Sequence, residues 1–286
     1  MDSKSIMPTF GPAGCCRAFA ADGGKQTKDI FPWLAKMGLD AFEYQCGNGI
    51  RASDKALAEI GAAAKEAGIR MSLHAPYFIS LSGIEETTRL KSLDYIRASL
   101  HAAELLGAYL IVIHTGSAAR LERREALRLA ADTLSRAIDE FGESGIKLGL
   151  ETMGKQNQLG TPEEVLELCR ISPRLAPVFD MGHINARSCG AELASTDSFR
   201  RTFCLVGEKL GENAAKELHC HFSRIEHTAA GEKKHLNFED DGSFGPDYRH
   251  FAEAIHAEGL HPRVICESAG NMSRDALTIK KYYLSL

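Results

Sequence analysis

The sequence has no cysteine pair at the spacing of a metal ribbon and no long apolar run. Its eight cysteines form one adjacent pair, Cys15 and Cys16, and six singletons. Without a CxxC motif, a zinc ribbon and a disulfide framework both have little support. No apolar run approaches the roughly 18 to 20 residues of a membrane span, and the start MDSKSIMPTFG lacks the order of a signal peptide. We therefore expect a soluble, cytoplasmic protein that has no membrane partner and is a monomer.

The chain also lacks an excess of positive charge. Its 34 Lys and Arg and its 38 Asp and Glu give a net charge of -4. This balance argues against a protein that holds nucleic acid by bulk positive charge alone. Two bound divalent cations would bring the net charge of -4 to 0, and three would bring it to +2. A mildly acidic chain could therefore still present a locally positive site.

Short apolar or β-branched runs alternate with segments of helical spacing. The runs are MPTFG, DAFEYQC, RMSLHAP, YLIVIHTG, IKLGLET, LAPVFDMGH, KELHCHFS and RVICES. Helical segments include ASDKALAEIGAAAKEAG, RLKSLDYIRASLHAAELLG, RREALRLAADTLSRAIDEFGESG and TPEEVLELCR. This alternation predicts an α/β protein with a single (β/α)₈ TIM barrel domain over residues 1–286, although a doubly wound open sheet could give the same string.

Two connections differ from the rest of the chain. The connection from about Arg224 to Asp247, after the seventh predicted strand, is long, polar and rich in Gly, Lys and Glu. The stretch from Ile184 to Ser198 is also irregular. Loops of this length inside a compact domain are usually functional or mobile. In a barrel, both would lie at the C-terminal face of the strands, where active sites are built.

Side chains able to bind a metal stand at six of the eight predicted strand ends. In chain order they are His74, His114, Glu151, Asp180 with His183 three residues later, His219 and Glu267. The strand ends of a closed barrel converge, and imidazoles and carboxylates packed there would repel each other or stay unsatisfied unless cations organised them. Such ligands without cysteine favour zinc or manganese, and a carboxylate can bridge two ions. The sequence therefore predicts a metal site at the C-terminal face of the strands.

Several segments across nearly the whole chain share their order and spacing with one known family. They are SLHAPYFISL, RLKSLDYIRASLHAAELLGAYLIVIHTGS, GLETMGKQNQLGTPEEV, VFDMGHINA, ELHCHFS and CES. Together they resemble the endonuclease IV family of apurinic/apyrimidinic endonucleases, in the xylose isomerase-like TIM-barrel superfamily. The resemblance implies a trinuclear zinc site that hydrolyses the phosphodiester on the 5′ side of an abasic nucleotide in double-stranded DNA, a step of base-excision repair.

The resemblance assigns the strand-end residues to two ions that share Glu151. His74 and His114 would bind the first ion together with Glu151. The second ion would also be bound by Asp180, His219 and Glu267. Clustered dications lower the pKa of a bound water and so supply a hydroxide for attack on phosphate. Because a bridging carboxylate would position both ions and orient that hydroxide, Glu151 is the expected catalytic residue.

The third ion is where the sequence departs from the family. The resemblance implies that His183 and His235 bind it, but Lys233 stands where the family has Asp. A protonated lysine only donates hydrogen bonds and cannot be a ligand. Glu232 could replace the missing carboxylate, or His221 could contribute from the seventh strand. We therefore expect two zinc ions, with manganese as an alternative metal, and leave the third site open.

Contacts to DNA are implied by the same resemblance. The family inserts a Tyr-Leu pair and an arginine into the minor groove, and Tyr77, Phe78 and Arg51 stand at the matching positions. An apolar wedge suits this task because extruding a nucleotide exposes stacking surface. Without the resemblance, packing of Tyr77 and Phe78 against the barrel rim is the simpler interpretation.

Two other functions fit parts of the same pattern. The four residues assigned to the second ion also match the single-metal set of sugar isomerases and epimerases that resemble the xylose isomerase group, in which two carboxylates act as acid and base. His74, His114 and His183 would be surplus in such an enzyme, which favours phosphodiester cleavage. A metal-dependent DNA-binding protein without turnover is the third hypothesis, and salt-sensitive binding without cleavage would support it.

Overall fold

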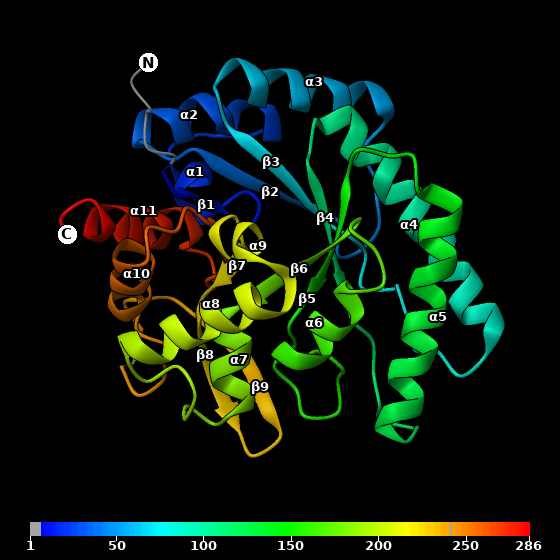
Figure 1. The fold of residues 1–286 in the computed structure, drawn as a ribbon. Helices are drawn as coiled ribbons and strands as arrows, with labels where there is room; N and C mark the ends of the chain where they lie inside the picture. Colours follow the sequence, from blue (N-terminus) through cyan, green and yellow to red (C-terminus); the bar gives the residue numbers. More distant parts are fainter. Residues whose placement is uncertain (1–6, 241) are drawn as a thin grey trace.

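The computed structural model describes residues 7–240 and 242–286, so the first six residues of the start assessed for a signal peptide lie outside the described part of the chain. All eight predicted strands are confirmed, and neighbouring strands pair in parallel to form one barrel sheet. The strands are β1 (Thr9–Pro12), β2 (Ala41–Gln45), β3 (Arg70–His74), β4 (Leu110–His114), β5 (Lys147–Glu151), β6 (Leu175–Asp180), β7 (His219–Phe222) and β10 (Arg263–Cys266). Their order is β1-β10-β7-β6-β5-β4-β3-β2, and Figure 1 shows them at the centre of the molecule.

The barrel closes between β1 and β2. Ala13 and Glu43 form an isolated parallel bridge there, and the Gly14 amide donates to the Glu43 carbonyl at 2.9 Å. Gly11 makes this approach possible, because a Cβ at that position would lie 1.7 Å from the carbonyl oxygen of Ala41. The sheet is therefore a nearly closed TIM barrel, and the alternative of an open doubly wound sheet is excluded.

Helices surround the strands (Figure 1). They are α1 (Arg17–Ala21), the 3-10 turn η1 (Thr27–Asp29), α2 (Ile30–Met37), α3 (Asp54–Glu66), α4 (Glu86–Leu106), α5 (Arg123–Phe141), α6 (Pro162–Cys169), α7 (Met181–Arg187), α8 (Thr196–Leu210), α9 (Glu212–Lys216), α10 (Tyr248–Ala257) and α11 (Met272–Tyr283). Local chemistry fixes several ends. Ser53 Oγ caps α3, Thr161 and Glu164 form a capping box at α6, and Gly107 ends α4 in the left-handed conformation with φ 66°. These signals agree with the helices expected from the sequence.

The alternation of side chains along β2 shows how the core and the interior of the barrel are divided. Phe42 faces outward, and its ring centroid lies 5.3 Å from that of Phe31 on α2. Each such fully buried aromatic side chain contributes about 1.5–3 kcal/mol through the hydrophobic effect. Glu43, the next residue, faces the interior and is fully buried. The helices thus pack on an apolar outer surface of the sheet, while polar side chains occupy part of the interior.

The structure corrects the expected irregular connections. The segment expected as one long loop from Arg224 to Asp247 contains a hairpin of β8 (Arg224–Thr228) and β9 (Gly231–Leu236). The stretch from 184 to 198 contains the end of α7 and the start of α8. The hairpin and these two helix ends were not predicted, because polar residues at the exposed rim of a barrel lack the apolar periodicity of buried helices and strands.

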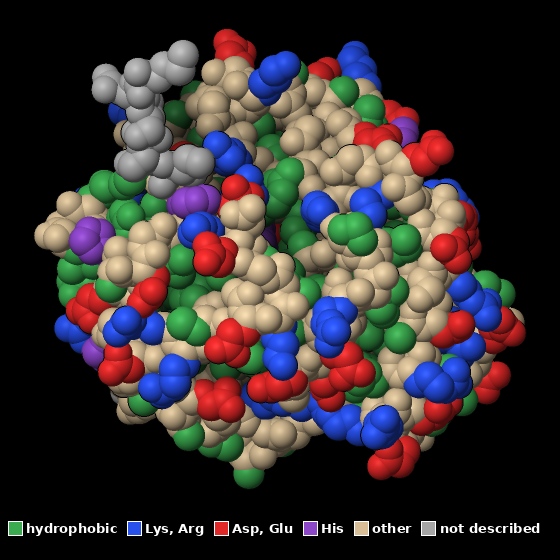
Figure 2. Space-filling model, viewed as in Figure 1, with side chains coloured by type: hydrophobic (Ala, Val, Ile, Leu, Met, Phe, Trp, Pro, Cys, Tyr) green, Lys and Arg blue, Asp and Glu red, His purple; other side chains and the backbone are tan. Residues whose placement is uncertain are grey.

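The surface is mixed in charge. Figure 2 shows acidic and basic side chains interspersed over the face in view, in agreement with the net charge of -4. That face therefore offers no broad cationic surface to a polyanion. Within the described ranges, no helix combines the length and the apolarity that crossing a membrane requires.

Candidate metal centre

Parallel pairing brings the metal-type residues together at the C-terminal ends of the strands. In the register of the sheet, His114 on β4 pairs with Glu151 on β5, and Asp180 on β6 pairs with His221 on β7. Glu267 directly follows β10, and its amide donates to the carbonyl of Phe222 at the end of β7. The closed barrel then places all of these side chains around one centre.

The first group consists of His74, His114 and Glu151, as the sequence predicted. Nε2 of His114 lies 3.3 Å, and Nε2 of His74 lies 3.5 Å, from the same oxygen of Glu151, Oε2. Two ligand atoms bound at about 2.1 Å to a tetrahedral zinc lie about 3.4 Å apart. The spacing of this group is therefore that of a ligand set for one ion.

The second group shares Glu151 and adds three residues, Asp180, His221 and Glu267. Nδ1 of His221 lies 2.9 Å from Glu151 Oε1 and 3.6 Å from Glu267 Oε1. The expectation that His219 belongs to this group is therefore corrected, because His221 occupies the place assigned to it. Both side chains point into the barrel, since residues two apart lie on the same face of a strand. His221 is two residues nearer the C-terminal end, and this decides which of them reaches the site.

The third group consists of His183, Glu232 and His235. Asp180 caps α7 by accepting from the His183 amide at 2.7 Å, which fixes His183 over the second group. The hairpin supplies the other two residues: Glu232 lies 3.5 Å from His183 Nε2 and 3.8 Å from His235 Nε2. Lys233 instead points to solvent and pairs with Glu226. The structure thus brings Glu232, and not Lys233, together with His183 and His235.

The second nitrogen of most of these imidazoles is already held by an oxygen. Nδ1 of His74 donates to the carbonyl of Ala75 at 2.9 Å, and Nδ1 of His183 donates to that of Thr152 at 3.0 Å. The remaining two contacts are His235 Nδ1 with Ser223 Oγ and His221 Nε2 with Glu43 Oε2. Histidines that bind metals are oriented in this way, with the other ring nitrogen bonded to an oxygen.

Two carboxylate oxygens at the centre lack hydrogen-bond partners among the described residues. They are Glu151 Oε2 and Asp180 Oδ2, both buried, and each faces a histidine nitrogen at 3.3 to 3.5 Å without forming a hydrogen bond. A buried carboxylate oxygen without a donor is costly unless a cation meets it. These orphaned atoms and the ligand spacing both fit divalent ions, so the residues present are suited to a metal.

The pKa values of these side chains also indicate a site suited to cations. Burial by itself would lower the pKa of His74, but Glu151, Glu43 and Glu267 raise it to about 9. Burial would likewise lower the pKa of His183, but Asp180, Glu151 and Glu232 raise it to about 9. The pKa of Glu267 is raised, first by burial and then by the neighbouring carboxylates. Without ions, protons on the histidines balance the excess of negative charge, and a cation could replace them.

Of the three residues expected to contact DNA, Tyr77 lies against the first group. The ring of Tyr77 stacks on His114 with centroids 5.1 Å apart and meets His74 edge-on at 5.3 Å. Tyr77 and Phe78 are nevertheless 57% and 53% exposed. Gly47 allows this packing, because a Cβ there would lie 2.4 Å from the Tyr77 ring. Arg51 lies exposed in the same loop after β2.

Two residues near the centre were not predicted from the sequence. Glu43, a fully buried carboxylate on β2, contacts both His219 and His221, and the Tyr109 hydroxyl is hydrogen-bonded to His219. A charged residue in the middle of the apolar run DAFEYQC is a signal that could have identified Glu43. Tyr109 carries no comparable signal.

The family of the chain follows from a model of conserved sequence features. The model described as xylose isomerase-like TIM barrel matches residues 31–281. The chain therefore belongs to this family and is an enzyme of the xylose isomerase-like superfamily.

Two curated relatives match much of the chain. An uncharacterized protein of Methanocaldococcus jannaschii is 29% identical over 99% of this chain and 100% of its own length. A protein named probable endonuclease 4 from Streptomyces avermitilis is 29% identical over 78% of this chain and 73% of its own length. The similarity to proteins of that name is thus extensive but of low identity.

Solved structures share the barrel with two kinds of enzyme. Endonuclease IV from Thermus thermophilus superposes with a TM-score of 0.69 at 17% identity, covering 91% of this chain and 94% of that one. A D-tagatose 3-epimerase-like protein superposes with a TM-score of 0.63 at 24% identity, covering 86% and 89%. At these identities the likeness shows the fold alone.

Proposed function

We propose that this protein is a metal-dependent endodeoxyribonuclease that incises the phosphodiester on the 5′ side of abasic sites. The observation that carries the proposal is the third group, His183, Glu232 and His235, beside the two groups that share Glu151. A single-metal sugar enzyme needs only the second group. Three adjacent ligand sets instead suit a phosphodiester, whose attacking oxygen, leaving oxygen and phosphoryl oxygens all need stabilising.

The charge of the site also favours a phosphate substrate. The three groups contain four carboxylates, Glu151, Asp180, Glu232 and Glu267, which carry four negative charges when ionised. Three dications, one in each group, would leave the centre with two positive charges. When bound, such ions supply Lewis-acid chemistry, lowering the pKa of water in contact with them and offsetting charge on the leaving oxygen. A locally cationic centre is thereby compatible with a chain of net charge -4.

Glu151 is the residue on which the chemistry is proposed to depend. One of its oxygens faces His74 and His114, and the other faces His221. The carboxylate thus lies between the first and second groups and would fix the distance between their ions. It is held at its base by β5, whose register places it opposite His114.

The exposed aromatic side chains beside the first group would provide the contact to damaged DNA. Tyr77 presents its ring edge and outer face at the rim, while its inner face rests on His114. Burial first, and then the nearby carboxylates, raise the pKa of Tyr77 to about 12, so its phenol stays neutral beside a phosphate. With Phe78 and Arg51, it could fill the space left by an extruded abasic nucleotide.

The experiment that tests the proposal pairs elemental analysis of the purified protein with a nicking assay on a duplex carrying one synthetic abasic site. We expect two or three zinc or manganese ions per chain and chelator-sensitive incision on the 5′ side. An undamaged duplex of the same sequence is the control substrate. Incision that survives metal removal, or metal-loaded protein that leaves the abasic duplex intact, would refute the proposal.

A sugar isomerase or epimerase is the second candidate. It is favoured by the second group, whose Glu151, Asp180, His221 and Glu267 form a complete set for one ion on the ends of four strands. One tightly bound ion per chain, no nicking and interconversion of ketose epimers would establish this alternative. Loss of Glu232 would then leave activity unchanged, whereas the endonuclease proposal requires a loss.

A further inference from the structure

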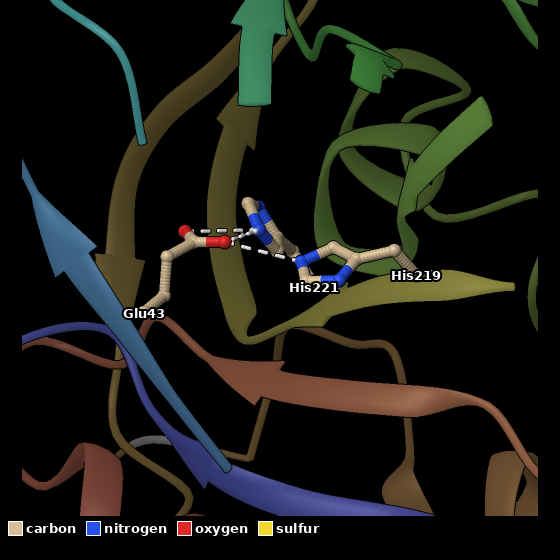
Figure 3. Close-up of side chains that lie close together, drawn as sticks. All are labelled: Glu43, His219 and His221. Carbon is tan, nitrogen blue, oxygen red and sulfur yellow. Dashed lines mark hydrogen bonds and ion pairs between the residues drawn. The ribbon is translucent and has the colours of Figure 1, made fainter. Parts of the chain in front are cut away.

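A second polar layer lies beneath the proposed metal ligands, inside the barrel. It consists of Glu43 on β2 and His219 on β7, and His221 joins it to the layer above (Figure 3). All three side chains are buried, with exposed fractions of 0%, 3% and 0%. Figure 3 shows both imidazoles pointing at the carboxylate of Glu43 from the far side of the barrel.

Glu43 is surrounded by hydrogen-bond donors. Its Oε2 accepts from Ser72 Oγ at 2.9 Å, from His219 Nε2 at 3.1 Å and from His221 Nε2 at 3.2 Å. Its Oε1 accepts from Gln45 Nε2 at 3.1 Å. A carboxylate this well supplied is stable in the interior without a cation of its own.

These contacts show which hydrogen of His221 would remain when an ion binds. An ionised carboxylate only accepts hydrogen bonds, so Nε2 of His221 must carry a hydrogen when it bonds to Glu43. Nδ1 lies among the second-group oxygens, 2.9 Å from Glu151 Oε1, and by the same argument carries a hydrogen in that contact. An ion bound by the second group would displace the hydrogen on Nδ1, while the hydrogen on Nε2 stays bonded to Glu43. His219 is ordered in the same way: Nε2 donates to Glu43, and Nδ1 accepts from the Tyr109 hydroxyl.

We propose that Glu43 is a positioning residue that selects the His221 tautomer with a free Nδ1, and that His219 holds Glu43 in place from below. This inference rests on the proposed metal function of the second group. Glu43 itself does not touch the ion or the substrate. A series of hydrogen bonds would thereby hold one metal ligand in a fixed orientation. It runs from Tyr109 through His219 and Glu43 to His221.

An additional ion held by Glu43, His219 and His221 is the competing explanation. The four donors on Glu43 argue against it, since an ion there would have to displace two N–H bonds and take the Nε2 lone pair of His221. His221 would then need to be doubly deprotonated to serve the second group as well. The number of ions per chain therefore distinguishes a positioning carboxylate from an inner metal site.

The test compares Glu43→Gln with the wild-type protein in three measurements on the metal-loaded full chain. The Gln amide would turn a donor toward neighbours that are all donors, so we expect zinc at the second site to bind about 10- to 100-fold more weakly. The visible absorption of the cobalt-substituted protein should change because His221 is no longer fixed. The ions per chain at saturating zinc should stay the same.

Two controls separate positioning from general damage to the fold. Glu164→Gln makes the same chemical change at a carboxylate that caps α6 and pairs with Arg123, and should leave zinc affinity and the cobalt spectrum unchanged. Ser72→Ala removes one hydrogen-bond donor to Glu43 and should weaken zinc binding, as Glu43→Gln does. Its control is Thr133→Ala, which removes a buried hydroxyl bonded to the carbonyl of Leu81 and should leave zinc affinity unchanged.

If Glu43→Gln does not fold, nitrogen NMR of the histidines in the zinc-loaded wild-type protein still shows which nitrogen of His221 binds the ion. We expect His221 to bind through Nδ1 and to retain its Nε2 hydrogen. Binding through Nε2, unchanged zinc affinity in Glu43→Gln, or the loss of a whole ion in that variant would each overturn the inference. Wild-type protein that binds no ion would instead refute the proposed function on which it rests.

Discussion

Replacing Glu232 should remove the third ion while leaving the other two. Glu232 is the carboxylate of the third group, and Glu232→Ala leaves only His183 and His235 to hold an ion. The neighbouring substitution Lys233→Ala is the matched control. Lys233 lies on the same strand, but its side chain is 56% exposed and pairs with Glu226 rather than with the centre.

The magnitude follows from the linkage between binding and folding. At free zinc 100-fold above the dissociation constant, an ion that binds only the folded chain stabilises it by about 2.7 kcal/mol. We therefore expect Glu232→Ala to lose one ion per chain and about 2.7 kcal/mol of the stability that such zinc confers. Lys233→Ala loses an exposed ion pair, which contributes about 0 to 1 kcal/mol, and keeps all of its ions.

Elemental analysis and urea unfolding, each with and without a chelator, provide the measurements. The difference between variant and wild type should vanish once all ions are removed, because the effect of Glu232 is proposed to act through the metal. Three ions retained in Glu232→Ala, or equal losses in Lys233→Ala, would refute the assignment of the third group. A destabilisation that persists in the chelator would mean that Glu232 mainly supports the packing of the hairpin.

Three further predictions concern the rest of the centre. Glu151→Gln should keep the fold, measured by circular dichroism, yet lower the nicking rate by more than about 100-fold. A loss of about 100-fold is the most expected when the residue removed only supports a metal ligand. Full activity of Glu151→Gln would contradict the bridging role. Tyr77→Ala and Phe78→Ala should each weaken binding to abasic duplex about 5- to 150-fold, since stacking contributes about 1–3 kcal/mol, with zinc content unchanged; equal losses on undamaged duplex would argue against a wedge. The pKa values of His74 and His183 are raised to about 9 without ions, so each ion that binds there displaces a proton. Zinc affinity at their sites should therefore rise about tenfold per pH unit from pH 7 to 9. A zinc affinity that does not change with pH in chelator-buffered titrations would show that these imidazoles are already neutral.

The same raised pKa values contribute to the pH dependence of the stability of the metal-free protein. A histidine stabilises the fold when its pKa is higher in the folded than in the unfolded protein. This contribution is fully present at pH values below the unfolded pKa, near 6.5, and is lost as the pH rises through the folded pKa of about 9. Metal-free protein should therefore unfold at lower urea concentrations at pH 9 than at pH 6. The zinc-loaded protein should not show this loss, since the ions take the place of the protons.

The barrel could be predicted because its strands are short apolar runs separated by helices with clear caps. The strand-end positions of His74, His114 and Glu151 then follow from the closure of the sheet. The choice between His219 and His221 could not be made, because both face the interior and only the register of β7 against β6 shows which lies level with Asp180. Pattern alone gives the face of a strand but not the height along the barrel axis.

The hairpin was harder to predict than the barrel, and it carries the residues that distinguish the candidate functions. The second group lies on strand ends, where a sugar epimerase and an endonuclease could both place a metal. The third group instead depends on α7 and on the β8–β9 hairpin, which brings Glu232 and His235 over the barrel. Loops at this face can vary without disturbing the barrel beneath them, so the proposed phosphodiesterase chemistry depends on this rim element. Removal of the third ion by Glu232→Ala therefore tests the function, whereas Glu43→Gln tests only the support of a ligand that both functions would use.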